Sequence, residues 1–120
     1  MKKTVYITGS GGYLGQELIK RLINNKRYNL FLCFDDATSF IANRQLQESD
    51  IIIHLVAKHP SYKGSNQEMD RINYQFTKFL FDNKKEHCQF VFLSTDYVFA
   101  GGNEVYHTGD SKNPNTFYGI

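Results

Sequence analysis

Four short apolar runs are spaced along the chain, and each is bounded by glycine, asparagine or charged residues. The runs are rich in the β-branched and aromatic side chains that favour buried strands. They cover residues 4–8, 29–34, 50–56 and 90–94. Because these runs are continuous rather than alternating, the strands are expected to be buried on both faces.

The segments between the runs repeat their apolar residues every three or four positions, which is typical of amphipathic helices. This pattern covers residues 13–23 and 67–84, with a shorter helix expected over residues 39–47. Beyond the fourth run the chain is expected to be loop as far as Pro114. A polar loop over residues 59–66 either borders a substrate or is a plain connector, and both interpretations stay open.

Strands that alternate with helices predict an α/β fold with a Rossmann-like, doubly wound parallel sheet of about four strands. No change of composition marks a boundary, so residues 1–120 are expected to form one domain. Only about 14 residues separate Asp36 from Ile51, enough for one helix but not for a helix, a strand and a second helix. We therefore expect the usual far edge strand to be missing.

Composition narrows the possible functions. The net charge of +2 is small and its cations are dispersed, which disfavours nucleic-acid binding. No apolar stretch is long enough to cross a bilayer, so a cytoplasmic protein without a membrane partner is expected. Cys33 and Cys88 lie in or beside apolar runs and are expected to be core residues. The four histidines lack metal-ligand spacing, so we expect no metal site and take them as core or surface residues.

The first strand runs into the sequence TGSGGYLG, which then opens the first helix. In this context Gly9 permits a tight turn, Gly12 lets a pyrophosphate approach the backbone, and Gly15 allows close packing of helix on strand. Free amides at the helix start favour phosphate. The cofactor-binding residues expected here are Gly9, Ser10, Gly12, Tyr13, Leu14 and Gly15. A plain glycine-rich surface turn is the alternative, and the flanking strand and helix count against it.

Asp35 follows the glycine motif by about 20 residues, where an acid can bind an adenosine ribose and repel a 2′-phosphate. Together with Asp36 it favours NAD as the cofactor. No arginine adjoins Asp35, although Lys26 or Arg27 could reach a 2′-phosphate, so NADP stays possible.

These motifs resemble those of the extended short-chain dehydrogenases/reductases, whose glycine pattern is TGxxGxxG. The segment from His54 to Ala57 resembles the family's HLAA, which implies that Leu55, Val56 and Ala57 line the cofactor cleft. Asn73 resembles the asparagine of the family's NVxGT helix, which supports an active-site lysine through water.

Later segments narrow the resemblance. Residues 94–99 read STDYVF, as in dTDP-4-dehydrorhamnose reductases, which implies that Thr95 hydrogen-bonds the reacting sugar oxygen. Tyr118 resembles the tyrosine of a Tyr-x-x-x-Lys element whose lysine would fall beyond Ile120. Sugar-nucleotide dehydratases carry a glutamate base where this chain has Tyr97. The resemblance therefore disfavours a dehydratase and leaves reductases and epimerases as the candidate classes of enzyme.

The resemblance implies the cofactor-binding part of an NAD(P)-dependent sugar-nucleotide reductase of dTDP-rhamnose biosynthesis. Thr95 would polarise a 4-keto oxygen and Tyr118 would act as acid or base. Without the lysine, for which Lys112 is a poor substitute, the chain is expected to be inactive alone. The later strands and the substrate subdomain would be absent, exposing an apolar edge on a possible homo-oligomer. The alternatives are an epimerase fragment, a non-catalytic dinucleotide-binding regulatory module and an inactive remnant.

Overall fold

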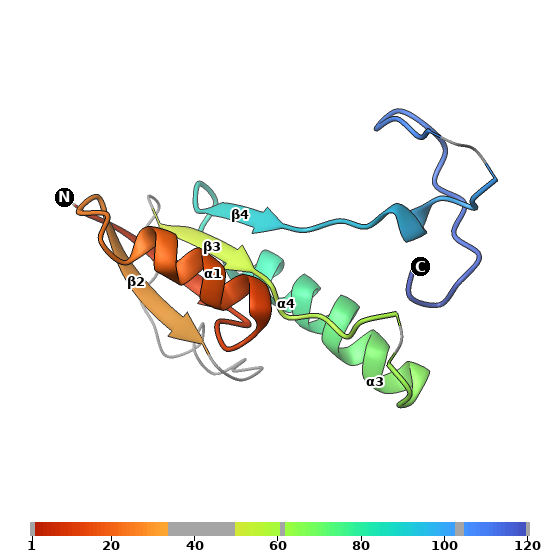
Figure 1. The fold of residues 1–120 in the computed structure, drawn as a ribbon, viewed down its shortest axis with the longest axis horizontal. Coiled ribbons are helices and arrows are strands. Elements are labelled where there is room, and N and C mark those ends of the chain that lie inside the picture. The colour runs from red at the N-terminus through yellow and green to blue at the C-terminus, as the bar shows by residue number, and fades with distance from the viewer. Residues whose placement is uncertain (1, 34–49, 61, 103–104, 120) are drawn as a thin grey trace.

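The computed structural model describes residues 2–33, 50–60, 62–102 and 105–119 (Figure 1). Its strands are β1 (Lys3–Thr8), β2 (Tyr28–Cys33), β3 (Ile51–His54) and β4 (Gln89–Phe92). Its helices are α1 (Tyr13–Leu22), α3 (Asn66–Asp70), the π-helical stretch η1 (Arg71–Gln75), α4 (Phe76–Asn83) and the short 3₁₀ turn η2 (Asp96–Val98).

The strands form one parallel sheet in the order β2-β1-β3-β4. The chain therefore reverses its direction of travel across the sheet after β2, which defines a topological switch point beside β1. Thr8 is aligned with Cys33 on one side and with His54 on the other, so these three strands end at a common edge. The predicted doubly wound, Rossmann-like parallel sheet is confirmed.

The two faces of the sheet are covered by different helices, with α1 on one side and α4 on the other (Figure 1). The main core lies on the α4 side, where Tyr6 and Ile52 pack with Phe76 and Leu80. Val5 and Ile7 alternate with Tyr6 and are also buried, as expected for a central strand. Cys33 and Cys88 are buried in the same hydrophobic cluster, which confirms them as core residues.

Some elements differ in detail from the sequence-based expectations, and other expectations are not tested by the described residues. The third strand ends at His54 rather than at residue 56. The Leu55 amide makes the last bond of the ladder, to the Thr8 carbonyl over 3.3 Å, and β1 then ends because Gly9 turns away at a φ of +68°. The helix expected over residues 67–84 contains the π-helical stretch Arg71–Gln75. The helix expected over residues 39–47, and the stretch where a far edge strand was expected to be missing, lie outside the described residues.

The segment after β4 extends away from the sheet (Figure 1). The radius of gyration is accordingly 15.8 Å, against about 13.6 Å for a compact chain of this length. Within the described part of the chain, no helix has the length and apolar character needed to cross a membrane.

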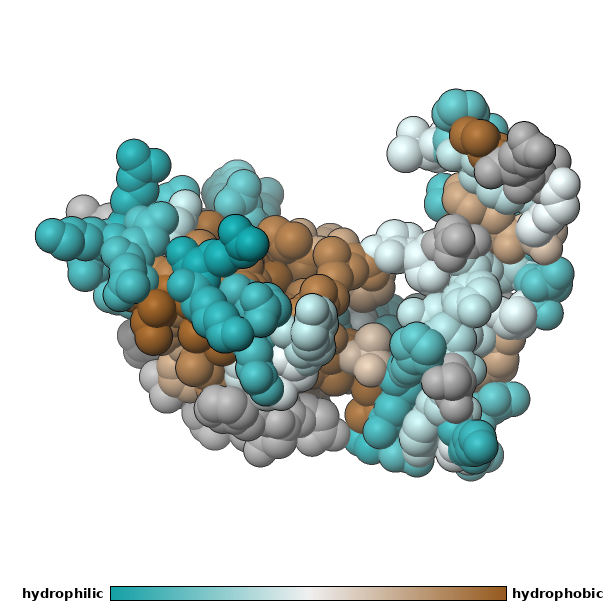
Figure 2. All heavy atoms as spheres, in the orientation of Figure 1, coloured by the Kyte–Doolittle hydropathy of each residue, from teal (hydrophilic) through white to brown (hydrophobic). Residues whose placement is uncertain are grey.

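β4 forms one edge of the sheet, and its apolar side chains are exposed. Phe92 is 52% accessible and Leu93, just beyond the strand, is 53% accessible. Figure 2 shows hydrophobic side chains gathered near the centre of this view, around the region of β3 and β4. The exposed apolar edge anticipated from the sequence is present.

Candidate functional site

Gly9 is the first residue of the loop that joins β1 to α1, and its geometry admits only glycine. Its φ of +68° lies in the left-handed region, which side chains disfavour. A Cβ at this position would also lie 3.0 Å from the carbonyl carbon of Leu55 and 3.0 Å from the amide nitrogen of Val56. The loop after β1 is thus pressed against the chain that leaves β3.

Gly15 and Gly12 complete the loop for different reasons. A Cβ on Gly15 would lie 2.7 Å from the Cα of Ser10, so α1 can begin this close to the loop only without a side chain there. Gly12 is the N-cap of α1 and has an ordinary extended conformation, with φ of −78°. A Cβ on Gly12 would be 3.3 Å from the carbonyl oxygen of Gly9, a tight contact that small shifts relieve. Gly12 therefore leaves an open approach to the backbone.

The first turn of α1 presents amides that have no acceptor within the helix. No side chain caps this end of the helix, whose last turn carries Lys20 and Arg21. Tyr13 and Leu14 are exposed at 82% and 55%. This helix start therefore combines positive dipole character, free donors and accessible apolar side chains, which is the chemistry that a dinucleotide requires.

Ser10 ties the loop to the neighbouring strand. Its hydroxyl donates to the carbonyl of Cys33 over 2.8 Å, its backbone amide donates to the same oxygen over 3.2 Å, and the residue is buried. These bonds explain why the loop stays next to the end of β2. A direct cofactor contact from Ser10 remains a prediction.

Leu55 and Val56 are half-buried beside Gly9, and Ala57 is exposed. The amide of Leu55 donates to the hydroxyl of Thr8 over 3.0 Å, which fixes the chain as it leaves β3. The structure therefore brings this predicted cofactor segment together with the glycine loop. Asp35 and Asp36 lie outside the described residues, and their ribose contacts remain a prediction.

Asn73 lies in the π-helical stretch η1, and both its amide oxygen and its amide nitrogen are hydrogen-bonded. Its Oδ1 accepts from the backbone amide of Lys58 over 2.6 Å, and its Nδ2 donates to the carbonyl of Lys58 over 3.1 Å. Asn73 therefore clamps the backbone just after Ala57. π-Helical turns are frequent at functional sites, and the predicted role of Asn73 toward a lysine is additional to this clamp.

A polar cluster organises the loop that follows Lys58. The Tyr62 hydroxyl donates to the Glu68 carboxylate, and this bond raises the pKa of Tyr62. The Lys58 ammonium lies 3.9 Å from Glu68 and 4.6 Å from the centre of the Tyr62 ring. Ser65 caps α3 by accepting from the amide of Glu68 over 3.1 Å.

His54 is the functional-site feature that sequence reasoning missed. Its ring is 1% exposed, and burial lowers its pKa to about 4. Nδ1 lies 2.6 Å from the Thr8 hydroxyl, and Nε2 lies 2.8 Å from the Thr77 hydroxyl. The available signal was that Thr8 and His54 end neighbouring parallel strands. The sequence left open whether His54 lies in the core or at the surface, and the structure places it in the core with a polar network that was not foreseen.

Thr95 and Tyr118 belong to the segment beyond β4. The Thr95 hydroxyl accepts from the amide of Tyr97 over 3.3 Å, and the rings of Tyr97 and Tyr118 meet edge to face at 5.2 Å. A Cβ on Gly119 would collide with the carbonyl of Tyr97, so this close approach requires glycine. Both predicted catalytic residues are therefore linked through Tyr97, and their catalytic roles remain predictions.

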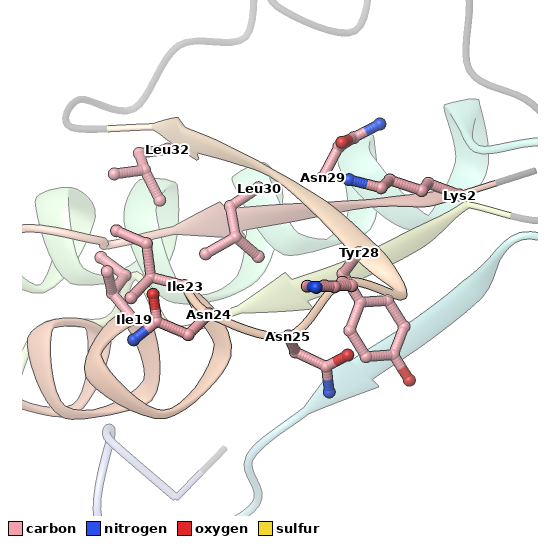
Figure 3. A pocket seen from close by; sticks show the side chains of 10 residues that line it. Lys2, Ile19, Ile23, Asn24, Asn25, Tyr28, Asn29, Leu30 and Leu32 are labelled. Carbon is pink, nitrogen blue, oxygen red and sulfur yellow. The ribbon is translucent and has the colours of Figure 1, made fainter.

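An open pocket of about 470 Å³ lies away from these residues, between α1 and the start of β2 (Figure 3). Figure 3 shows Ile19 and Ile23 on one side of it and Leu30 and Leu32 on the other, with Asn24, Asn25 and Lys2 at its rim. It adjoins the amino ends of the strands, so we do not assign it to the dinucleotide. Within the described ranges, no cluster of three or more histidine, cysteine or acidic side chains could hold a metal ion.

A parallel sheet with a glycine loop at its switch point and a helix start facing outward defines a Rossmann-like nucleotide-binding class of fold. The family model described as the RmlD substrate binding domain matches residues 1–120, so the chain belongs to this family. The resemblance to short-chain dehydrogenases/reductases of the dTDP-4-dehydrorhamnose reductase type is thereby confirmed.

Three comparisons illustrate the relationship. The chain is 29% identical over 128 residues to the spore coat polysaccharide biosynthesis protein SpsK of Bacillus subtilis, covering 96% of this chain and 44% of SpsK. It is 29% identical, with a TM-score of 0.83, to dTDP-4-dehydrorhamnose reductase of Bacillus anthracis in complex with NADP, covering 99% and 46% of the two chains. UDP-glucuronic acid 4-epimerase of Bacillus cereus in complex with NAD shares the fold at 19% identity and a TM-score of 0.77, covering 97% and 47%. The chain thus spans about half the length of these relatives.

Proposed function

We propose that this chain forms the dinucleotide-binding part of an NAD(P)-dependent sugar-nucleotide reductase, with an epimerase of the same superfamily as the alternative. The observation that carries the proposal is Gly12, the N-cap of α1, where a Cβ would meet only the Gly9 oxygen at 3.3 Å and the approach to the backbone is open. A side chain would fill this space, and the backbone around it is the surface on which a pyrophosphate rests in such folds.

The residues present fit a nicotinamide dinucleotide. The loop and the first turn of α1 would bind the pyrophosphate, and Tyr13, Leu14 and the Leu55–Ala57 backbone would line the rest of the cleft. Bound there, the cofactor would supply the hydride that reduces a sugar ketone. Asp35 and Asp36 favour NAD by their charge, although the reductase from Bacillus anthracis was solved with NADP.

The chain also carries two groups suited to the substrate side of the reaction. The Thr95 hydroxyl would donate a hydrogen bond to the 4-keto oxygen of a nucleotide sugar and so polarise the carbonyl. The Tyr118 hydroxyl would deliver the proton that this oxygen needs when the ketone becomes an alcohol. A neighbouring cation is needed to favour the phenolate that remains. No such cation is among the site residues named above. Cofactor binding therefore tests the proposed function more directly than catalysis does.

Gly12→Ala tests the cofactor site with little cost to the fold, because the added methyl meets only the Gly9 oxygen at 3.3 Å. We expect the chain to bind NADH and NADPH, with NADH tighter. In Gly12→Ala the Kd for NADH should rise about 10-fold or more, since the methyl occupies the pyrophosphate approach. Cofactor fluorescence titration measures both quantities.

Gly109→Ala is the matched control, because a Cβ at Gly109 meets nothing within 4 Å. It should bind NADH like the unmodified chain. The proposal is wrong if the folded chain binds neither dinucleotide at millimolar concentration, or if both alanine variants bind equally well.

A further inference from the structure

His54 combines full burial with two hydrogen-bonded nitrogens. It ends β3 at the carboxyl edge of the sheet, and the rings of Phe76, Phe90 and Phe92 surround it at centroid distances of 5.4, 5.9 and 6.2 Å. In so apolar a surrounding, an unsatisfied ring nitrogen would be costly. The direction of each hydrogen bond therefore determines which ring nitrogen of His54 carries the proton.

Counting hydrogens fixes these directions. The Thr77 hydroxyl has one hydrogen, which it donates to the Asn73 carbonyl over 2.8 Å. It can then only accept from His54, so Nε2 must carry the ring proton. A neutral ring leaves a lone pair on Nδ1, which accepts the hydrogen of the Thr8 hydroxyl. Thr8 in turn accepts from the amide of Leu55.

The result is a directed chain from Leu55 through Thr8, His54 and Thr77 to Asn73. It joins the ends of β1 and β3 to the helix on the far side of the core. Thr8 immediately precedes Gly9, and Leu55 is the residue against which Gly9 packs. The opposite tautomer would leave Nε2 without a donor, because the single hydrogen of the Thr77 hydroxyl goes to the Asn73 carbonyl.

We propose that His54, as the neutral tautomer with its proton on Nε2, is a positioning residue that holds the Leu55 backbone against the glycine loop and thereby sets dinucleotide affinity. This inference rests on the proposed cofactor site. In this proposal His54, Thr8 and Thr77 act on cofactor affinity indirectly, through the position of the Leu55 backbone, and do not contact the cofactor themselves.

The tautomer is tested directly on the ligand-free chain. Long-range proton–nitrogen NMR of the His54 ring, assigned by loss of its signals in His54→Phe, should show a protonated Nε2 and a bare Nδ1 at neutral pH. A protonated Nδ1, or a doubly protonated ring, would overturn the proposal. This measurement needs no cofactor, so its outcome is independent of whether the chain binds a dinucleotide.

Positioning is tested with Thr77→Val, which keeps the side-chain shape but removes the hydroxyl, and with Thr77→Ser, which restores it. In Thr77→Val we expect the Leu55 amide to exchange its hydrogen about 10-fold faster and the Kd for NADH to rise by about 10-fold. Thr77→Ser should return both values to within about 2-fold of the unmodified chain.

Circular dichroism of each variant checks that it remains folded. Unchanged Leu55 exchange in folded Thr77→Val, or a serine variant no better than the valine variant, would refute positioning through His54. Absence of NADH binding by the unmodified chain, with the expected tautomer and exchange results, would refute the cofactor site and with it the link to affinity. Intact binding with the wrong tautomer would refute the positioning role alone.

Discussion

Glycines of the same motif are required for different physical reasons. Gly9 is constrained both by its positive φ and by contact with Leu55, whereas Gly15 is constrained by space alone. Gly12 has neither constraint in full, since its φ is ordinary and its one close contact is at 3.3 Å. Substitution at Gly9 or Gly15 therefore reports on folding, and substitution at Gly12 reports on the ligand.

The buried His54 makes stability depend on pH. Its pKa falls from 6.5 to about 4 in the folded chain because burial disfavours the charged ring. Between these values the unfolded chain binds a proton that the folded chain does not, so stability is lost as the pH falls from about 6.5 to 4. The loss contributed by His54 should approach roughly 3 kcal/mol. Urea unfolding at a series of pH values measures it.

Replacing His54 with Gln should remove most of this slope, even if the variant is less stable at every pH. His107→Gln is the control, because His107 is exposed and should leave the slope unchanged. Equal slopes for His54→Gln and the unmodified chain would show that the pH dependence has another source.

At the scale of single residues, the sequence identified the glycines but not the polar network beneath them. The positive φ of Gly9 and the close packing at Gly15 follow from local chain geometry, which the motif encodes. The Thr8–His54 bond joins residues 46 positions apart, and it becomes visible only once the register of two strands is known. His54 alone looks like any other histidine near an apolar run.

The π-helical stretch η1 places Asn73 where its amide can clamp Lys58. Both polar ends of that amide are paired with one backbone unit, so the clamp holds the chain after β3 in one position. This adds a second fixed point next to Leu55, and the segment from 55 to 58 is therefore restrained at both ends.

Asn73→Ala removes both bonds of the clamp and should lower the free energy of unfolding by about 1–3 kcal/mol. The Lys58 amide should also exchange its hydrogen faster, which NMR measures directly. Asn83→Ala is a matched control, because the Asn83 side chain makes one exposed bond to the Phe79 carbonyl. An equal loss of stability in both variants, without faster exchange at Lys58, would contradict the clamp.

The helices and strands were largely predictable from apolar spacing, because core contacts repeat with the period of each element. The π turn was not predictable, because it accompanies a side-chain bond between residues 15 positions apart. The third strand was predicted too long for a similar reason. Leu55 and Val56 are apolar enough for a strand, but β1 ends at Thr8 and Gly9 turns away, so β1 offers no further residue for them to pair with.

At the scale of the whole molecule, the exposed edge of β4 is a surface on which another chain could pair. The strand has no proline and no charged residue to block pairing with another chain. Val91 is 44% exposed, with Phe92 beside it on the opposite face. Edge-to-edge pairing of two copies would cover these groups, so the chain is expected to self-associate as its concentration rises.

Val91→Lys should reduce this self-association, because a charge on the edge strand opposes pairing. Sedimentation velocity over a concentration series measures the effect. Thr108→Lys adds the same charge at an exposed site in the segment after β4 and should leave association unchanged. A purely monomeric parent chain, or equal effects of the two lysines, would contradict pairing through β4.

The arrangement of the whole sheet was predicted well, because alternating strands and helices permit few topologies. A ribose-binding role for Asp35 and Asp36 was predicted from spacing alone, and it stays a prediction because both residues lie outside the described ranges. The position of the segment bearing Thr95 and Tyr118 could not be deduced, since its described residues contain no strand that would fix it to the sheet. Within this segment, the contact between Gly119 and Tyr97 joins residues 22 positions apart, so only the three-dimensional structure reveals it.

The two buried thiols stand at different places in the sheet, Cys33 at the end of β2 and Cys88 just before β4, and neither is disulfide-bonded. A thiol-modifying reagent can reach each sulfur only when its own part of the core opens. The two thiols are therefore natural probes of local unfolding. Their separate labelling rates would show whether the β2 side or the β4 side of the sheet unfolds first.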